Sequence, residues 1–272
     1  MKFAFCTCVQ IGLSCMESIY RANGKLDLIV TLHDSKAKQK SGRIYVDDFA
    51  QKHKISVLKI NHINDNETIE SLKKHSIDWF FIIGWSQIAS KEVIDAPNFG
   101  AIGAHPTLLP EGRGRASIPW AIIKGLKKTG VTFFKIDEGV DTGAILKQQE
   151  VIINEEKETA MTLYDKINKA HEILIESLYP DLLNNGVKLT KQNESNATYW
   201  ECRKPEDGRL DSCMSVDEAD RLIRATTKPY PGAFIIKNNK KMIIWSGKKG
   251  VDSSASFILD FKDGKYSVLE FE

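Results

Sequence analysis

The chain has 272 residues, of which 42% are hydrophobic and 27% are charged, and its 38 basic and 36 acidic residues leave a formal net charge of +2. These values are ordinary for a folded globular protein. The near balance of charge excludes the broad basic surface that binds nucleic acid or an anionic membrane. No apolar run approaches the roughly 18 residues of a membrane span. We therefore expect a cytoplasmic protein without a nucleic-acid or membrane partner.

The first apolar run, FAFCTCVQIGL, must be distinguished from a secretion signal. Gln10 interrupts it, no small-residue cleavage site follows, and Met16, Ile19 and Tyr20 continue at helical spacing. This pattern predicts a first core strand followed by a helix.

Five cysteines occur without a C-x-x-C pair: Cys6, Cys8, Cys15, Cys202 and Cys213. Cys6 and Cys8 share one face of the first predicted strand, but no second pair matches them. Such cysteines are typical of buried free thiols rather than of metal ligands. We predict no metal site.

Short apolar runs and helical patterns alternate over the first hundred residues. The apolar runs are rich in β-branched and aromatic residues and too short for buried helices. They span residues 3–5, 28–30, 56–58 and 79–83. Helical patterns lie between them, at residues 17–22, 45–52 and 67–74. This alternation predicts an α/β fold with a doubly wound, mostly parallel sheet, in which substrates bind beyond the carboxyl ends of the strands.

Three strand exits are candidate binding loops for that reason. Gly12 follows the first strand, the basic segment 36–43 follows the second, and residues 84–87 follow the most apolar one. A basic segment is often only a solvated loop, but at the carboxyl end of a strand it suits a phosphate group. Its candidate residues are Lys38, Lys40, Ser41 and Arg43.

Three further strands are expected after residue 100. They lie near residues 101–102, 130–135 and 144–148. A long helix follows at 160–183, and Asn184-Asn185-Gly186 closes it with a left-handed residue. Beyond a polar linker, a short helix at 216–224 precedes small antiparallel β structure. Turn signals for that β structure lie at 238–239, 249–250 and 263–264.

A histidine and an aspartate stand out in the loop-rich stretch of the middle of the chain. His105 is followed by two prolines in GAHPTLLP, which restrict the loop and help to aim the imidazole ring. Asp141 lies in the turn DEGVDTG. Taken alone, the histidine is more often structural and such a carboxylate is usually a turn former. Each segment is a weak signal by itself.

Together, however, residues 100–186 strongly resemble the folate-dependent formyltransferases, through the blocks HPTLLPEGRGRASIPWAI, TGVTFFKIDEGVDTGAIL and TAMTLYDKI. PEDGRLD and IRATTKPYPGAF resemble the start of the second domain in the sugar-nucleotide and methionyl-tRNA members. The resemblance implies a Rossmann-like formyltransferase fold with a small, β-rich, OB-like C-terminal subdomain. It implies a catalytic domain at 1–190, a linker at 191–204 and the subdomain at 205–272.

The resemblance also implies a triad of asparagine, histidine and aspartate around the formyl carbon. His105 and Asp141 match two members, whereas Gly103 stands at the position of the asparagine. That asparagine would donate a hydrogen bond to the oxyanion of the tetrahedral intermediate, and losing one such donor costs about 10²–10³ in rate. The candidates to replace it are His105 alone, a water molecule, Thr107, Arg113 and Ser117. Otherwise the chain has lost activity.

Amine formylation suits a paired histidine and carboxylate. A neutral amine attacks the formyl carbon, and a group must accept its proton and deliver one to the departing folate nitrogen. Histidine side chains titrate near neutral pH, which suits this exchange. Asp141, hydrogen-bonded to His105, would orient the ring and stabilise its charged form.

The implied formyl donor is N10-formyltetrahydrofolate, which needs a slot for its flat pterin. By family position, the backbone of residues 84–88 and 137–140 forms the walls, with Trp85 near the mouth; Trp85 alone is equally consistent with a core aromatic. The implied donor-binding residues are Gly84, Trp85, Ser86, Gln87, Ile88, Asp137, Glu138, Gly139 and Val140.

The expected acceptor is the amine of a nucleotide-linked amino-deoxysugar, of the UDP- or dTDP-4-amino-4,6-dideoxy type, used in surface polysaccharide synthesis. The basic strand exit and the short C-terminal part favour it. The residues expected to contact it are Lys38, Lys40, Ser41, Arg43, Thr107, Arg113 and Gly114. We also expect a homodimer.

Other acceptors and a non-catalytic role stay open. A methionyl-tRNA acceptor is disfavoured by the small net charge, because phosphate contacts dominate affinity for nucleic acids. A glycinamide ribonucleotide enzyme would lack the PEDGRLD and PYPGAF blocks. A catalytically weakened folate or sugar-nucleotide binding protein is favoured by Gly103 and disfavoured by the retention of His105 and Asp141.

Overall fold

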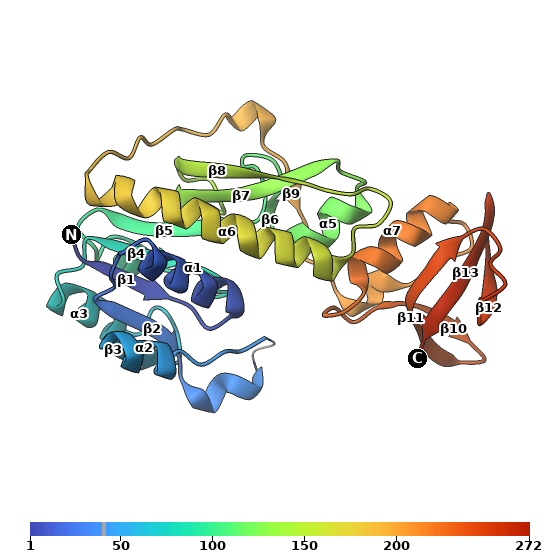
Figure 1. The fold of residues 1–272 in the computed structure, drawn as a ribbon, viewed down its shortest axis with the longest axis horizontal. Helices are drawn as coiled ribbons and strands as arrows, with labels where there is room; N and C mark the ends of the chain where they lie inside the picture. The colour runs from blue at the N-terminus through green and yellow to red at the C-terminus, as the bar shows by residue number, and fades with distance from the viewer. Residues whose placement is uncertain (40–41) are drawn as a thin grey trace. The chain divides into compact units, whose positions relative to one another are not determined.

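The computed structural model describes residues 1–39 and 42–272, and the chain forms two compact units (Figure 1). Unit 1 comprises Met1–Arg113, Gly130–Gln149 and Asn168–Thr198. Unit 2 comprises Gly114–Thr129, Glu150–Ile167 and Tyr199–Glu272.

A seven-stranded sheet forms the centre of unit 1, with strand order β3-β2-β1-β4-β5-β7-β8. Its strands are β1 (Phe3–Cys6), β2 (Leu28–Leu32), β3 (Ser56–Ile60), β4 (Trp79–Ile82), β5 (Gly100–His105), β7 (Lys128–Lys135) and β8 (Ile145–Ile152). The strands from β3 to β5 are parallel, and β7 is antiparallel to β5. This confirms the predicted doubly wound, mostly parallel sheet. The strand order reverses between β1 and β4, where ligands bind in such folds.

Helices cover both faces of this sheet, because its strands carry apolar side chains on both sides. They are α1 (Gln10–Arg21), α2 (Asp47–His53), α3 (Asn66–Lys74), the short α4 (Lys91–Ile94) and α6 (Ala160–Leu183). Ala4 and Cys6 of β1 join one core cluster with residues of α3 and α4. On the other face, Phe3 packs against Tyr179 of α6, with 4.7 Å between the ring centres.

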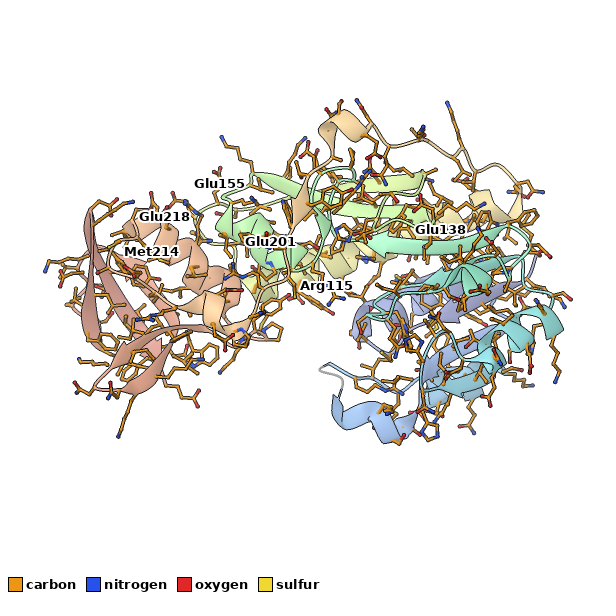
Figure 2. The ribbon with its side chains drawn as sticks, turned by 180° about the vertical axis from the view of Figure 1, so that it is seen from behind. Arg115, Glu138, Glu155, Glu201, Met214 and Glu218 are labelled. Atoms are coloured by element: carbon orange, nitrogen blue, oxygen red, sulfur yellow. The ribbon has the colours of Figure 1, made fainter. Side chains whose placement is uncertain are left out.

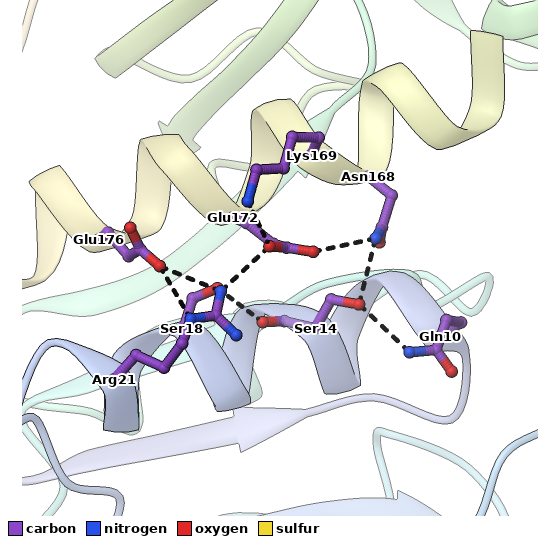
Figure 3. Close-up of polar contacts among 8 residues, drawn as sticks. All are labelled: Gln10, Ser14, Ser18, Arg21, Asn168, Lys169, Glu172 and Glu176. Carbon is purple, nitrogen blue, oxygen red and sulfur yellow. Dashed lines mark hydrogen bonds and ion pairs between the residues drawn. The ribbon is translucent and has the colours of Figure 1, made fainter. Parts of the chain in front are cut away.

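Polar side chains join α1 to α6 above that second face (Figure 3). Nη2 of Arg21 lies 3.0 Å from carboxylate oxygens of both Glu172 and Glu176. One turn or more away, Nδ2 of Asn168 donates to the hydroxyl of Ser14 at 3.2 Å. These bonds fix the direction of α6 against the first helix and therefore against β1.

One helix boundary differs from the sequence prediction. The first helix begins at Gln10 and not near residue 17, because the small residues of its first turns gave no helical pattern. Gly12 therefore lies inside α1 and is not a loop residue; a Cβ there would overlap the side chain of Thr7. The long helix ends as expected at Leu183, and Asn185 is the residue with the left-handed φ of 52°.

Unit 2 combines helices with a four-stranded antiparallel sheet of order β10-β11-β13-β12. Its main elements are α5 (Ser117–Ile123), α7 (Val216–Thr226), β10 (Ala233–Lys237), β11 (Lys240–Lys249), β12 (Phe257–Phe261) and β13 (Gly264–Phe271). Two hairpin turns, β10–β11 and β12–β13, lie at the predicted signals 238–239 and 263–264, whereas the signal at 249–250 marks the end of β11 and not a hairpin, because β11 pairs with β13. Ser215 begins α7 by accepting from the backbone N–H of Glu218 at 3.1 Å, while the Glu218 carboxylate accepts from the Ser215 N–H.

Several short elements were not predicted. They are the 3₁₀ helices Asp34–Gln39, Glu194–Asn196 and Pro205–Gly208 and the paired strands β6 (Arg113–Gly114) and β9 (Tyr199–Trp200). The stretch expected as a linker therefore contains a strand. Within the described residues, none of the helices combines the length and the apolar character that crossing a membrane requires.

Tyr179 offers a test of how α6 is attached to the sheet. Its hydroxyl donates to the carbonyl oxygen of Lys25 at 2.7 Å and accepts from the Lys25 N–H at 3.0 Å. We expect Tyr179→Phe to lower the free energy of unfolding by about 1 kcal/mol, because both backbone groups lose a partner. Urea denaturation measures this. Tyr45→Phe, at an exposed tyrosine, is the control and should leave stability unchanged; equal effects of the two changes would contradict the role of Tyr179.

Candidate active site

Two segments of unit 1 bring His105 and Asp141 together. His105 is the last residue of β5, and Asp141 lies in the loop between β7 and β8. Since β7 runs antiparallel to β5, Lys135 at its end pairs with Ile102, before His105 in the strand. The loop that follows returns along β5, and Oδ2 of Asp141 comes to 3.4 Å from Nδ1 of His105.

Each ring nitrogen of His105 faces an oxygen acceptor. Nε2 lies 2.8 Å from the carbonyl oxygen of Gly112, and Nδ1 faces the Asp141 carboxylate. A carbonyl oxygen only accepts, so Nε2 donates to Gly112 and Nδ1 is the ring nitrogen that faces the carboxylate. A histidine and a carboxylate thus lie side by side, which is an arrangement suited to proton transfer.

The backbone at Asp141 is held in the left-handed region, with φ of 56°. For a residue with a side chain, this conformation costs roughly 1–2 kcal/mol. It turns the chain at the point where the carboxylate must meet His105. The surrounding contacts have to offset that cost.

A cavity of about 280 Å³ lies beside the pair and has walls of two kinds. Ile82, Gly103, Ala104, Phe134 and Ile136 line it with apolar groups from the sheet and its edge. The remaining lining comes from two loops: Trp85, Gln87, Ile88 and Ala89 on one side, and Asp137, Glu138, Gly139, Val140 and Asp141 on the other. The structure thus brings most of the expected donor-binding residues around one cavity, without Gly84 and Ser86.

The first of these loops is held by Gln87. Its Oε1 accepts from the backbone N–H of Ile63 at 2.8 Å and from the indole N–H of Trp85 at 3.1 Å. Gly84, which begins the loop, has a φ of +68°, and a Cβ there would overlap the side chain of Val9. Close approach to Val9 therefore accounts for a glycine at this strand exit.

The second loop carries Glu138, which is labelled in Figure 2. Its carboxylate pairs with Lys91 of α4 at 3.0 Å, and Asp137 accepts from the Thr142 hydroxyl at 2.6 Å. A larger hollow of about 520 Å³ lies on the α4 side of this loop and shares Ile136 to Gly139 as lining. It contains neither His105 nor Asp141, so the smaller cavity is the one next to the chemistry.

Gly103 lies in the floor of the cavity, where a side chain would crowd its neighbours. A Cβ built there would come within 3.0 Å of Phe134 Cζ and 3.1 Å of Ile136 Cγ1. Both side chains would therefore have to shift by a few tenths of an ångström to admit a side chain at residue 103.

The predicted acceptor residues are only partly brought to the site. Lys40 and Ser41, and the side chain of Lys38, lie outside the described residues. Arg43 is 4% exposed and donates to the carbonyl oxygens of Leu32 and Ile44. Its guanidinium group therefore holds the end of β2, and this geometry does not favour the expected phosphate contact.

The other expected acceptor residues are also packed. Arg113 is fully buried, and its guanidinium group binds Gln192 and Glu194. Gly114 lies against the backbone of Trp200, with a φ of +108°. Thr107 is 2% exposed, and its hydroxyl has no hydrogen-bond partner within the described ranges. Of the proposed substitutes for the asparagine, Thr107 retains an unused donor, whereas Arg113 is committed elsewhere.

Two residues of this network were missed from the sequence. Gln192 and Glu194 lie in the stretch 191–204, which was expected to be a linker because it is polar throughout. Gln192 is in fact 4% exposed. No periodicity distinguishes it from its exposed neighbours. Across residues 1–39 and 42–272, no three His, Cys, Asp or Glu side chains gather as metal ligands would.

Comparison with known families agrees with this geometry. A family model described as "Formyl transferase" matches residues 15–178, and one described as "Formyl transferase, C-terminal domain" matches residues 203–268. The chain belongs to the formyl transferase family. It is a formyltransferase with the catalytic and C-terminal parts in the family's order.

Two relatives of the chain carry different names. The bifunctional polymyxin resistance protein ArnA of Wigglesworthia glossinidia brevipalpis is 34% identical over 92% of this chain. The chain spans only 38% of the length of that relative. A methionyl-tRNA formyltransferase of Agathobacter rectalis is 32% identical, over 91% of this chain and 80% of its own length.

Among solved structures, an N-formyltransferase from Helicobacter canadensis, in complex with folinic acid and dTDP-3-aminofucose, has the same fold. Its TM-score is 0.73, with 18% identity and all of both chains covered. At this identity the likeness establishes the fold alone.

Gly103 allows a test of the cavity floor. We expect Gly103→Ala to lower the free energy of unfolding by about 1–3 kcal/mol, because the added methyl group overpacks against Phe134. Thermal unfolding measures the loss. Gly186→Ala is the matched control, since a Cβ there has 3.7 Å to its nearest neighbour. Adding Phe134→Leu should recover part of the loss; no recovery, or an equal loss in the control, would refute the overlap.

Proposed function

We propose that this formyltransferase moves the formyl group of N10-formyltetrahydrofolate to the amine of a nucleotide-linked amino-deoxysugar. The observation that carries the reaction is the contact of 3.4 Å between His105 and Asp141 at the edge of a cavity. The sugar acceptor is supported by the small net charge of +2 and by the shared fold with an enzyme bound to dTDP-3-aminofucose.

The cavity has the properties that a pterin requires. Its floor is apolar, at Ile82, Phe134 and Ile136, and suits the face of a flat ring. The loop from Asp137 to Asp141 presents backbone and carboxylate groups at its edge, which suits a ring that hydrogen-bonds along its rim. Formylated folate, when bound, supplies the formyl carbon and a leaving nitrogen.

The part played by the chain is proton transfer. The amine loses one proton as its nitrogen bonds to the formyl carbon, and the folate nitrogen gains one as its bond to that carbon breaks. Asp141 lines the cavity, so its carboxylate is the group that meets the amine proton. His105 supports the changing charge of Asp141 from Nδ1, while its bond to Gly112 keeps the ring in place.

A methionyl-tRNA acceptor is the second candidate. The relative from Agathobacter rectalis supports it, since the chain covers 80% of that enzyme. The charge balance opposes it, because tRNA binding depends on phosphate contacts. A weakened binding protein, suggested by Gly103, is the third, and activity measurements separate it from both. The cytoplasmic location and the homodimer remain predictions.

His105→Asn and Asp141→Asn test the reaction. Each change removes one member of the His105–Asp141 pair, so we expect turnover to fall by about 10²–10⁴-fold. Product formation measured by mass spectrometry gives the rate. Binding of a stable folate analogue, measured by calorimetry, should persist because the cavity remains.

His75→Asn is the matched control for these variants. His75 ends α3, where its Nδ1 lies 2.8 Å from the Ser71 carbonyl, and it does not line the cavity. Its activity should equal that of the unchanged protein. Full activity in both site variants would refute the assignment of the pair.

A panel of amines tests the acceptor. Purified protein and formylated folate are incubated with UDP-, dTDP- and GDP-linked amino sugars and, separately, with methionyl-tRNA. We expect one sugar nucleotide to gain the mass of one CO group, because charge and fold both favour that class. Formylation of methionyl-tRNA alone would replace the proposal by its second candidate. No product from any acceptor would favour the binding protein.

A further inference from the structure

The side chain of Gln192 is buried and makes four hydrogen bonds to residues in or next to the His105–Asp141 pair. Its Nε2 donates to the carbonyl oxygens of Asp141 and Gly143, each at 2.8 Å. Its Oε1 accepts from Nε and Nη2 of Arg113, at 3.1 and 2.8 Å. An amide side chain suits this position because it can donate two hydrogen bonds from its nitrogen and accept two at its oxygen at the same time.

Arg113 is the second member of this arrangement. Its guanidinium group is fully buried and also binds the carboxylate of Glu194 through two bonds, at 2.8 and 2.7 Å. The hydrogen bonds from Arg113 hold the pKa of the Glu194 carboxyl below its usual value. The buried positive charge is therefore neutralised, as a buried charge has to be.

The backbone next to Arg113 leads directly to His105. Gly112 precedes it, and the Gly112 carbonyl oxygen accepts from Nε2 of His105 at 2.8 Å. The N–H of Gly112 donates to the hydroxyl of Thr198, and the N–H of Arg113 to the Thr198 carbonyl. Gly112 is thus held from both sides while it orients the ring.

These contacts form a closed ring of interactions. His105 bonds to Gly112, and the adjoining residue Arg113 bonds to Gln192. Gln192 in turn bonds to the backbone of Asp141, whose carboxylate contacts His105. Gln192 is the one side chain in it that bonds to both loops. We propose that Gln192 is a positioning residue, which sets the distance between His105 and Asp141 through Arg113 and the backbone of residues 141–143.

The left-handed backbone of Asp141 explains why such a residue is needed. The two carbonyl groups that Gln192 binds belong to the peptides 141–142 and 143–144, directly after the residue with φ of 56°, and the bonds fix the planes of these peptides. Without those bonds the loop can relax, and the carboxylate moves away from the imidazole. A displacement of about 1 Å at reacting groups can cost about 10²-fold in rate.

Gln192→Glu separates positioning from packing, because it keeps the shape and the acceptor toward Arg113 but removes both donors to the loop. This test rests on the proposed formyl transfer and uses the acceptor that the panel identifies. We expect kcat to fall by about 10²-fold, with KM for the folate donor little changed. Thermal unfolding should show a folded protein.

Two further variants separate packing from positioning. Glu194→Gln weakens the pairing of the buried Arg113 but leaves the bonds from Gln192 to the loop, so stability should fall while kcat falls less than in Gln192→Glu. Gln51→Glu makes the same chemical change at an exposed site on α2 and should retain kcat. Should Gln192→Glu not fold, Gln192→Met removes the same donors without a charge and is judged by the same criteria.

A readout without turnover keeps this proposal independent of the proposed function. Nuclear magnetic resonance of the full chain labelled with ¹⁵N-histidine reports the ring nitrogens, and His105→Asn identifies the His105 signals. We expect Gln192→Glu to shift the His105 signals and to leave the other histidines as they are in Gln51→Glu.

The outcomes are distinct. Unchanged kcat and unchanged His105 signals in a folded Gln192→Glu protein would overturn the proposal. Equal losses of activity and stability in Gln192→Glu and Glu194→Gln would also overturn it, in favour of a general packing role. If the unchanged protein formylates no acceptor, the proposed function fails, and the His105 signals still decide the role of Gln192.

Discussion

The contact between His105 and Asp141 depends on a reversal of chain direction within the sheet. Four neighbouring strand pairs are parallel, whereas β7 runs antiparallel to its neighbour β5. The loop after β7 therefore starts beside the middle of β5 and must travel back to reach its carboxyl end. This path explains why the loop turns at Asp141 and why it lines the edge of the cavity. One short loop thereby supplies both a wall for the donor and half of the proton-transferring pair.

The surrounding polar groups are arranged so that this loop has few alternative conformations. A buried guanidinium group, a buried amide and a surface carboxylate meet beneath it, and each satisfies the next. Buried polar networks of this kind stabilise a single arrangement only when every member is paired. The apolar floor of the cavity, by contrast, belongs to the core of the sheet and needs no such support. The site thus joins a rigid, apolar platform to a loop held by hydrogen bonds.

Much of this could be read from the sequence, and the limits have physical causes. The buried strands were predicted from short, continuous apolar runs and α6 from a long, regular apolar pattern, and the blocks around His105 and Asp141 carried the family resemblance. The first turns of α1 were missed because Gly12 and Ser14 carry little apolar signal. Gln192 was missed because burial of an amide depends on partners that are distant in the chain. Arg43 was expected at a phosphate, since sequence shows its charge and not the carbonyl groups that it binds.

The contact of Phe134 with Gly103 limits which residues fit at positions 103 and 134. A larger residue at position 103 requires a smaller side chain at position 134, and a smaller residue at position 134 alone leaves a void beside the glycine. An amide at the floor of the pocket therefore requires a compensating change at position 134 or 136, whereas a donor on the surrounding loops does not.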